Sequence, residues 1–222
     1  MNPTLIAIAV LLLLTVLTLG RARLRKSREI YIDRYDYARL LDARLAMKRT
    51  ELEPQQRQLV LRALTEYFQL CRMAGKQRMV SMPSQAVDDA WHEFILFTRN
   101  YDTFCQRALG RFLHHVPAEA MQSPTQAQDG IKRAWRLACL REGIDPKNPT
   151  RLPLLFSIDQ DLGIADGFHY IPDCKRAVSR SDSSGTAYCG SHIGCGGGCG
   201  GCSGSTADGA GCGGGGCGGG GD

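Results

Sequence analysis

Residues 54–75 form the stretch that decides the fold, and their sequence is PQQRQLVLRALTEYFQLCRMAG. Apolar side chains recur in it at helical spacing, at Val60, Leu64, Tyr67, Phe68 and Cys71. Pro54 suits the first turn of a helix, and Gly75 suits the position just after its end. The pattern therefore predicts an amphipathic helix over residues 54–75 that buries one face in a core.

The same periodicity extends to both sides of this helix. It predicts helices over about 33–49, from the cap residue Ser84 to about Leu109, over about 125–142, and a short one over 152–156. No stretch sustains the two-residue alternation of a half-buried strand, which argues against a sheet. We therefore predict an all-α fold with a small bundle of four or five helices.

An apolar run precedes this body. Residues 4–20 carry no charge and number 17, the low end of a membrane-spanning helix. A cleaved signal peptide is the alternative, but no basic residues precede the run and no small-residue cleavage pattern follows it. Five cations follow at once, namely Arg21, Arg23, Arg25, Lys26 and Arg28. This bias predicts a single-pass cell-membrane anchor with the bulk and the C-terminus of the chain in the cytoplasm.

The basic flank also explains much of the net charge of +5. We expect it to contact anionic lipid headgroups, and the absence of another basic cluster argues against nucleic-acid binding. The predicted organisation is an anchor with its flank at 1–28, a helical domain at 29–172, and a linker with a low-complexity tail at 173–222. The tail is predicted to be disordered, because residues 189–222 hold 18 of the 26 glycines and 6 of the 10 cysteines.

The chemically dense segment of the body is VDDAWHEF at 87–94. Asp88 and His92 lie four residues apart and so share one helix face, where the carboxylate can orient the imidazole. Cys105 lies about 20 Å from His92 on a straight helix and can join only if the helix breaks. His114 and His115 follow the helix and can fold back. These five residues form a candidate site for zinc or iron. The alternative is a structural cluster of polar side chains.

Three patterns in this region carry a family resemblance. They are V-D-x-x-W-H at 87–92, Y-x-x-F-C at 101–105 and G-x-x-x-H-H-x-P at 110–117. Together with the glycine-rich tail, they resemble the glycine-rich domain-containing protein-like family over residues 30–120. That family often has a second histidine in W-H-x-H, where this chain has Phe94. The resemblance implies a helical domain with a poorly defined biochemical role and supplies no catalytic mechanism.

The tail is a second candidate metal site. Its potential ligands are Cys189, His192, Cys195, Cys199, Cys202, Cys212 and Cys217. Thiolates favour zinc or another soft metal, and in the cytoplasm these thiols are expected to stay reduced. The spacing matches no regular zinc finger, so the metal itself would have to order the chain. The alternative is a low-complexity tail without specific thiol chemistry.

Three functional hypotheses follow. The first is a non-enzymatic, membrane-anchored helical module that binds a metal or a protein partner through its thiol-rich tail. The second is a metal-dependent enzyme or sensor with its site in the helical domain. The third is a purely structural domain with a neutral spacer. No nucleophile elbow, P-loop, dinucleotide fingerprint or His-Glu-x-x-His pattern is present, so the sequence favours a non-enzymatic role and identifies no catalytic residue.

Overall fold

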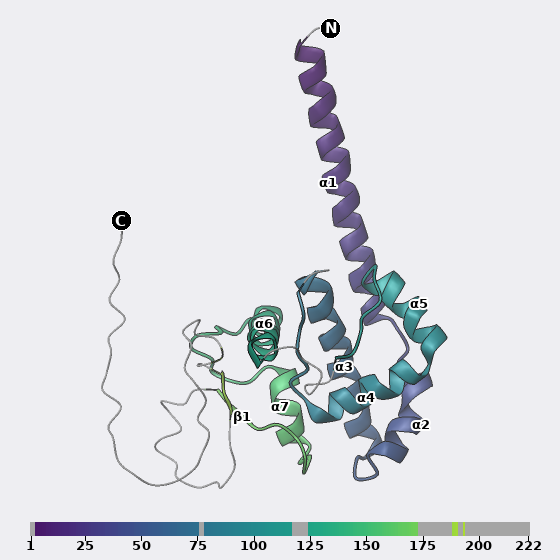
Figure 1. The fold of residues 1–222 in the computed structure, drawn as a ribbon, viewed down its shortest axis with the longest axis vertical. Coiled ribbons are helices and arrows are strands. Elements are labelled where there is room, and N and C mark those ends of the chain that lie inside the picture. Colours follow the sequence, from purple (N-terminus) through teal and green to yellow (C-terminus); the bar gives the residue numbers. More distant parts are fainter. Residues whose placement is uncertain (1–2, 76–77, 117–123, 173–187, 191–192, 194–222) are drawn as a thin grey trace, which may run out of the picture.

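A computed structural model describes residues 3–75, 78–116, 124–172, 188–190 and 193. The described part contains seven helices and one pair of two-residue strands, which confirms the all-α prediction (Figure 1). The body consists of α2–α7 and the end of α1. The body thus has six helices of its own, against the four or five predicted, because one predicted helix is divided in two. The linker and almost all of the glycine-rich tail lie outside the described residues.

The first helix, α1, runs without interruption from Pro3 to Asp33. It therefore includes the apolar run, the basic flank and only the first residue of the helix that we predicted over 33–49. The remainder of that predicted helix is α2, Ala38–Lys48. α1 is long and apolar enough to span a membrane, and its apolar segment is not buried against the body. Its last turns do pack on the body, where Ile32 is fully buried.

The central helix of the body is α3, Pro54–Ala74, which confirms the prediction from the amphipathic stretch. Its start is fixed by a capping box in which Glu53 and Gln56 satisfy each other's backbone N–H groups. Gly75 follows with a φ of 76°, a conformation that glycine adopts at little cost. α3 contacts α1, α2, α4, α6 and α7, so most of the core is built on its surface.

The predicted helix from Ser84 to Leu109 is two helices, α4 (Gln85–Leu96) and α5 (Thr98–Ala108). Phe97 separates them with φ −81° and ψ 59°, outside the helical region. The break has a packing reason, because α5 turns to place Tyr101 and Phe104 in the same core as Phe94. A straight helix would have carried α5 away from the body.

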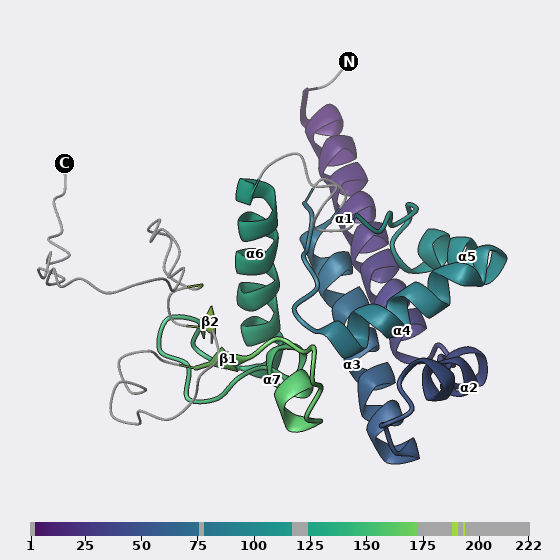
Figure 2. The same cartoon turned by 60° about the horizontal axis from the view of Figure 1, so that its bottom comes forward.

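The other half of the body contains α6 (Pro124–Glu142), which is close to prediction, and α7 (Leu154–Asp161), which begins two residues and ends five residues later than the predicted helix at 152–156. Trp135 of α6 is fully buried and donates a hydrogen bond of 3.0 Å from Nε1 to the carbonyl of Pro146. Two short strands, β1 (Tyr170–Ile171) and β2 (Tyr188–Cys189), pair in parallel beside this region (Figure 2). A two-residue pair does not change the fold class.

The core between α1 and α5 is aromatic. Rings of Tyr35, Tyr37, Phe68, Phe94 and Phe104 lie 4.7 to 6.1 Å apart, mostly edge to face. Such pairs contribute about 0.5–1.5 kcal/mol each beyond the area that they bury. This cluster fixes α4 and α5 against the end of α1 and therefore positions the site described below.

Candidate metal centre

The N-terminus of α4 is held by a buried carboxylate from another helix. Asp159 of α7 accepts hydrogen bonds from the hydroxyl of Ser84 (2.6 Å) and from the backbone N–H groups of Gln85 (2.7 Å) and Ala86 (3.2 Å). It also accepts one from the N–H of Phe168, and it is almost fully buried. A carboxylate at this end also complements the helix dipole. These bonds fix the first turn of α4, which carries Asp88.

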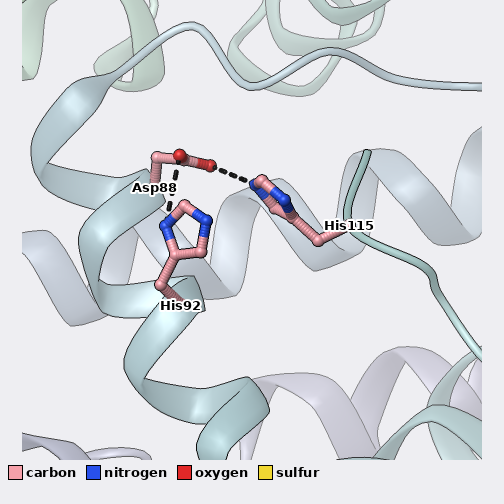
Figure 3. Close-up of side chains that lie close together, drawn as sticks. All are labelled: Asp88, His92 and His115. Atoms are coloured by element: carbon pink, nitrogen blue, oxygen red, sulfur yellow. Dashed lines mark hydrogen bonds and ion pairs between the residues drawn. The ribbon is translucent and has the colours of Figure 1, made fainter. Parts of the chain in front are cut away.

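Three side chains converge on the outer face of this turn (Figure 3). His115 Nε2 is 3.0 Å from Asp88 Oδ1, within hydrogen-bond distance. His92 Nδ1 lies 3.3 Å from the other oxygen, Oδ2. The two imidazole rings are 4.1 Å apart between centroids. The cluster thus joins two residues of α4 to one residue that lies 27 positions after Asp88.

The return of His115 to α4 depends on the segment after α5. Gly110 turns the chain with φ 69°, and a side chain there would collide with the guanidinium of Arg28. The hydroxyl of Tyr101 then donates a hydrogen bond of 2.5 Å to the carbonyl of Leu113. The His115 ring packs edge to face on Trp91, 4.5 Å between centroids. His115 is consequently held in place from two sides.

The dimensions of the cluster suit a small metal ion. One potential ligand atom from each residue lies within 4.8 Å of the other two. Ligands at zinc–nitrogen distances in tetrahedral geometry are about 3.3 Å apart, so the two pairs at 3.0 and 3.3 Å need little adjustment. The His92 side chain is 46% exposed, against 21% for Asp88 and 15% for His115. Solvent or a substrate can therefore reach a metal bound here.

Two predicted ligands of the body lie outside this cluster. The helix does break, as a site including Cys105 would require, but Cys105 points into the core and is fully buried. Burial raises the pKa of its thiol, which opposes formation of the thiolate that a metal needs. His114 is exposed and packs its ring 4.8 Å from that of Phe112. The structure thus brings together Asp88, His92 and His115, and places Cys105 and His114 elsewhere.

Most predicted tail ligands lie outside the described residues. These are His192, Cys195, Cys199, Cys202, Cys212 and Cys217. Cys189 is described, is buried beside β1, and is disulfide-bonded. A sulfur in a disulfide is not a thiolate ligand, so the role predicted for Cys189 requires that this disulfide is reduced. The thiols of Cys71, Cys105 and Cys139 are free and buried.

The acidic residues next to the cluster are ion-paired. Asp89 is buried and accepts a hydrogen bond of 2.6 Å from Nε of Arg49, while Glu93 pairs with Arg44. Arg49 also pairs with Asp166, and these carboxylates raise the pKa of its guanidinium. Neither carboxylate is therefore free to face the histidines. They instead join α4 to α2, which leaves Asp88 as the carboxylate that faces the histidines.

The sequence analysis did not identify Asp159 or the Tyr101 hydroxyl as groups that position the histidine–carboxylate cluster. Asp159 had a detectable signal, since it is an acidic residue among the apolar positions of a short helix (Leu155, Phe156 and Ile158). A buried carboxylate in such a place requires several donors. Tyr101 had no comparable signal, because an aromatic residue on the apolar face of a helix is expected in a core.

A comparison with protein-family models gives one finding about relationship. The UCP032817-like family model matches residues 27–193. This corrects the resemblance to the glycine-rich domain-containing protein-like family, to which no finding points. The match ends before most of the glycine-rich tail, so the tail composition that supported that resemblance is not part of the shared region. No curated protein and no solved structure matches the chain. Because the match covers most of the sequence, this chain belongs to the UCP032817-like family.

Proposed function

We propose that this protein is a membrane-anchored helical module whose body binds a divalent transition-metal ion through Asp88, His92 and His115. The observation that carries the proposal is the convergence of two imidazoles on the two oxygens of one carboxylate. The residues come from two separate segments, α4 and the stretch after α5, and Asp159 and Tyr101 hold those segments in position. An ordinary surface histidine does not require such support.

The donor set indicates the class of metal. Two imidazole nitrogens and one carboxylate oxygen suit zinc and neighbouring transition metals, whereas calcium and magnesium prefer sets of oxygen atoms. Three protein ligands leave a fourth position of a tetrahedral site for water or another molecule. The exposure of His92 places that position on the solvent side. This supports a binding or sensing role and assigns no reaction.

The proposed localisation is a cell membrane, with α1 as the anchor. Its long apolar segment supports this proposal, and the basic residues after that segment support a cytoplasmic body. The disulfide at Cys189 is a contrary observation, because disulfides persist mainly in oxidising compartments. Labelling of body lysines in intact cells with a membrane-impermeant reagent tests the orientation. Labelling without permeabilisation would place the body outside and overturn the cytoplasmic proposal.

The metal proposal is tested on the full-length chain, purified in a mild detergent. After removal of metal with a chelator, Zn²⁺ is titrated against a chromophoric competitor, and Co²⁺ is added separately to read the coordination from its visible spectrum. The variants are His115→Ala and the matched control His114→Ala. The control removes an adjacent, exposed histidine that does not contact the cluster.

We expect one tight ion to be lost in His115→Ala and retained in His114→Ala. A variant with all tail cysteines changed to serine separates the two candidate sites in the same chain. Retention of the ion in that variant supports the body site. Its loss there, together with unchanged binding in His115→Ala, would overturn the proposal in favour of the tail hypothesis. No bound metal in any variant would leave the cluster as a structural set of hydrogen bonds.

A further inference from the structure

A second surface feature lies between α6 and the segment that follows α3. It is a hollow of about 260 Å³ lined by Arg78, Asp129, Lys132, Arg133, Arg136 and Leu137. Four of these six residues are cationic and one is acidic, which corrects the expectation that the chain has no basic cluster besides the flank of the anchor. The hollow is separate from the metal cluster, with which it shares no residue.

The spacing of the charges places them on one face of α6. Lys132, Arg133 and Arg136 lie three, four and seven positions after Asp129, while Trp135 and its neighbours Ala134 and Ala138 are buried on the other face. Arg133 donates a hydrogen bond to the carbonyl of Met79, which joins the two walls. Within the described part of the chain, none of the four cations is ion-paired. Their charge is therefore available to a ligand.

The position of α6 relative to α1 indicates which class of ligand would lie near the hollow. In both views α6 lies closer to the free end of α1 than α2 and α7 do (Figures 1 and 2). The body cannot swing freely away, because Gln69 of α3 donates hydrogen bonds to the Glu29 carbonyl (3.0 Å) and to Asp33 Oδ1 (2.6 Å). The anchor and the body are thus joined as one helical framework. A membrane spanned by α1 would lie on the side of the body where α5 and α6 lie (Figures 1 and 2).

We propose that this hollow binds the phosphate-bearing headgroup of an anionic lipid in the membrane that α1 spans. Guanidinium groups bind phosphate oxygens with paired hydrogen bonds, and basic residues near an anionic leaflet strengthen membrane contact. Lys132 and Arg136 supply cations one helical turn apart. Asp129 weakens the site by its negative charge. The inference rests on the membrane anchoring in the proposed function and is independent of the metal site.

The test uses the full chain in detergent, titrated with phosphatidylglycerol or with phosphatidylcholine while bound lipid is counted by native mass spectrometry. We expect one retained phosphatidylglycerol per chain and no comparable retention of phosphatidylcholine. The variant Lys132→Gln/Arg136→Gln should weaken binding about tenfold or more, because each cation near the headgroup contributes to affinity. Asp129→Asn should strengthen it, a gain that misfolding cannot produce.

The matched control is Arg39→Gln/Arg62→Gln, which removes the same charge from exposed positions on α2 and α3 and should leave lipid binding unchanged. If this control weakened lipid binding equally, the loss of affinity would be an effect of net charge, and the proposed lipid site would be refuted. Competition by inorganic phosphate at the same concentration as the lipid would indicate a soluble anion instead. Release of the chain from membranes by alkaline carbonate would refute the anchoring itself, whereas firm insertion without lipid preference would refute this inference alone.

Discussion

The indole Nε1 of Trp91 donates a hydrogen bond of 3.0 Å to the hydroxyl of Tyr101. In a continuous helix, residues ten positions apart are separated by about 15 Å along the axis. The bond therefore requires the break at Phe97 between α4 and α5. Because the same hydroxyl donates to the Leu113 carbonyl, this one buried group joins α4, α5 and the segment that carries His115.

Tyr101→Phe should lower both stability and metal affinity. The substitution leaves the buried Leu113 carbonyl and the Trp91 N–H without their partner, at a cost of about 1–3 kcal/mol in the free energy of unfolding. It also frees the segment that carries His115. Denaturant unfolding and the Zn²⁺ titration measure the two effects. Tyr31→Phe, which removes a hydroxyl from a half-buried tyrosine of α1, is the control and should change neither.

Asp159→Asn should destabilise the body through the N-terminus of α4. The amide can accept at one atom only, so either the bonds from Ser84 and Ala86 to Oδ1 or those from Gln85 and Phe168 to Oδ2 are lost, at about 2–4 kcal/mol. Chemical denaturation measures the change. Asp161→Asn alters an exposed carboxylate on the same helix and should have little effect. Equal stability of the two variants would show that the buried carboxylate does not hold α4.

Zinc should stabilise the folded chain in a pH-dependent manner. At a free concentration 100 times the dissociation constant, binding adds about 2.7 kcal/mol to the free energy of unfolding. The gain should shrink as the pH falls, because protons compete with the metal for the imidazole nitrogens. Thermal unfolding with and without Zn²⁺ across pH 5.5–8 checks this. His115→Ala should abolish the gain at every pH, and His114→Ala should retain it.

Cys71 should resist alkylation until the chain unfolds. Burial raises the pKa of its thiol from 9.0 to about 12, which lowers the thiolate fraction at neutral pH about a thousandfold. The raised pKa also has a consequence for stability. The contribution of the protonated Cys71 thiol to the free energy of unfolding is fully present below pH 9. It is lost as the pH rises from 9 toward 12, because the thiol ionises at a lower pH in the unfolded chain than in the folded one. Peptide-resolved iodoacetamide labelling in increasing urea measures the protection, and fast labelling of the native chain would contradict it.

Local sequence patterns were sufficient for most individual helices. α3 begins at Pro54 and ends before Gly75 as its capping residues require, and α6 ends at Glu142 before the turn at Gly143. The pairing of Asp88 with His92 also followed from helical spacing alone. These features depend on neighbours within a few positions, which is why a sequence without a structure can reveal them.

The boundaries at 33 and 97 were not predictable in the same way. At 33, an apolar anchor and an amphipathic body helix were expected to be separate, but nothing in residues 21–33 interrupts the helix, and the body packs on its last turns. At 97, the helical spacing of Val87, Trp91, Phe94, Tyr101 and Cys105 gives no sign of an interruption. Only the gain from packing two aromatic segments on one core favours the bend at Phe97.

The sequence by itself determined the all-α class, the apolar N-terminal helix, the position of the central amphipathic helix, and the residue types of the proposed metal site. Periodicity, capping and charge are local properties, and they survive in the sequence as readable patterns. The tertiary structure decided which candidates meet. It selected His115 over His114, directed Cys105 into the core, and placed Asp159 under α4, because these choices depend on how distant segments pack around a shared aromatic core.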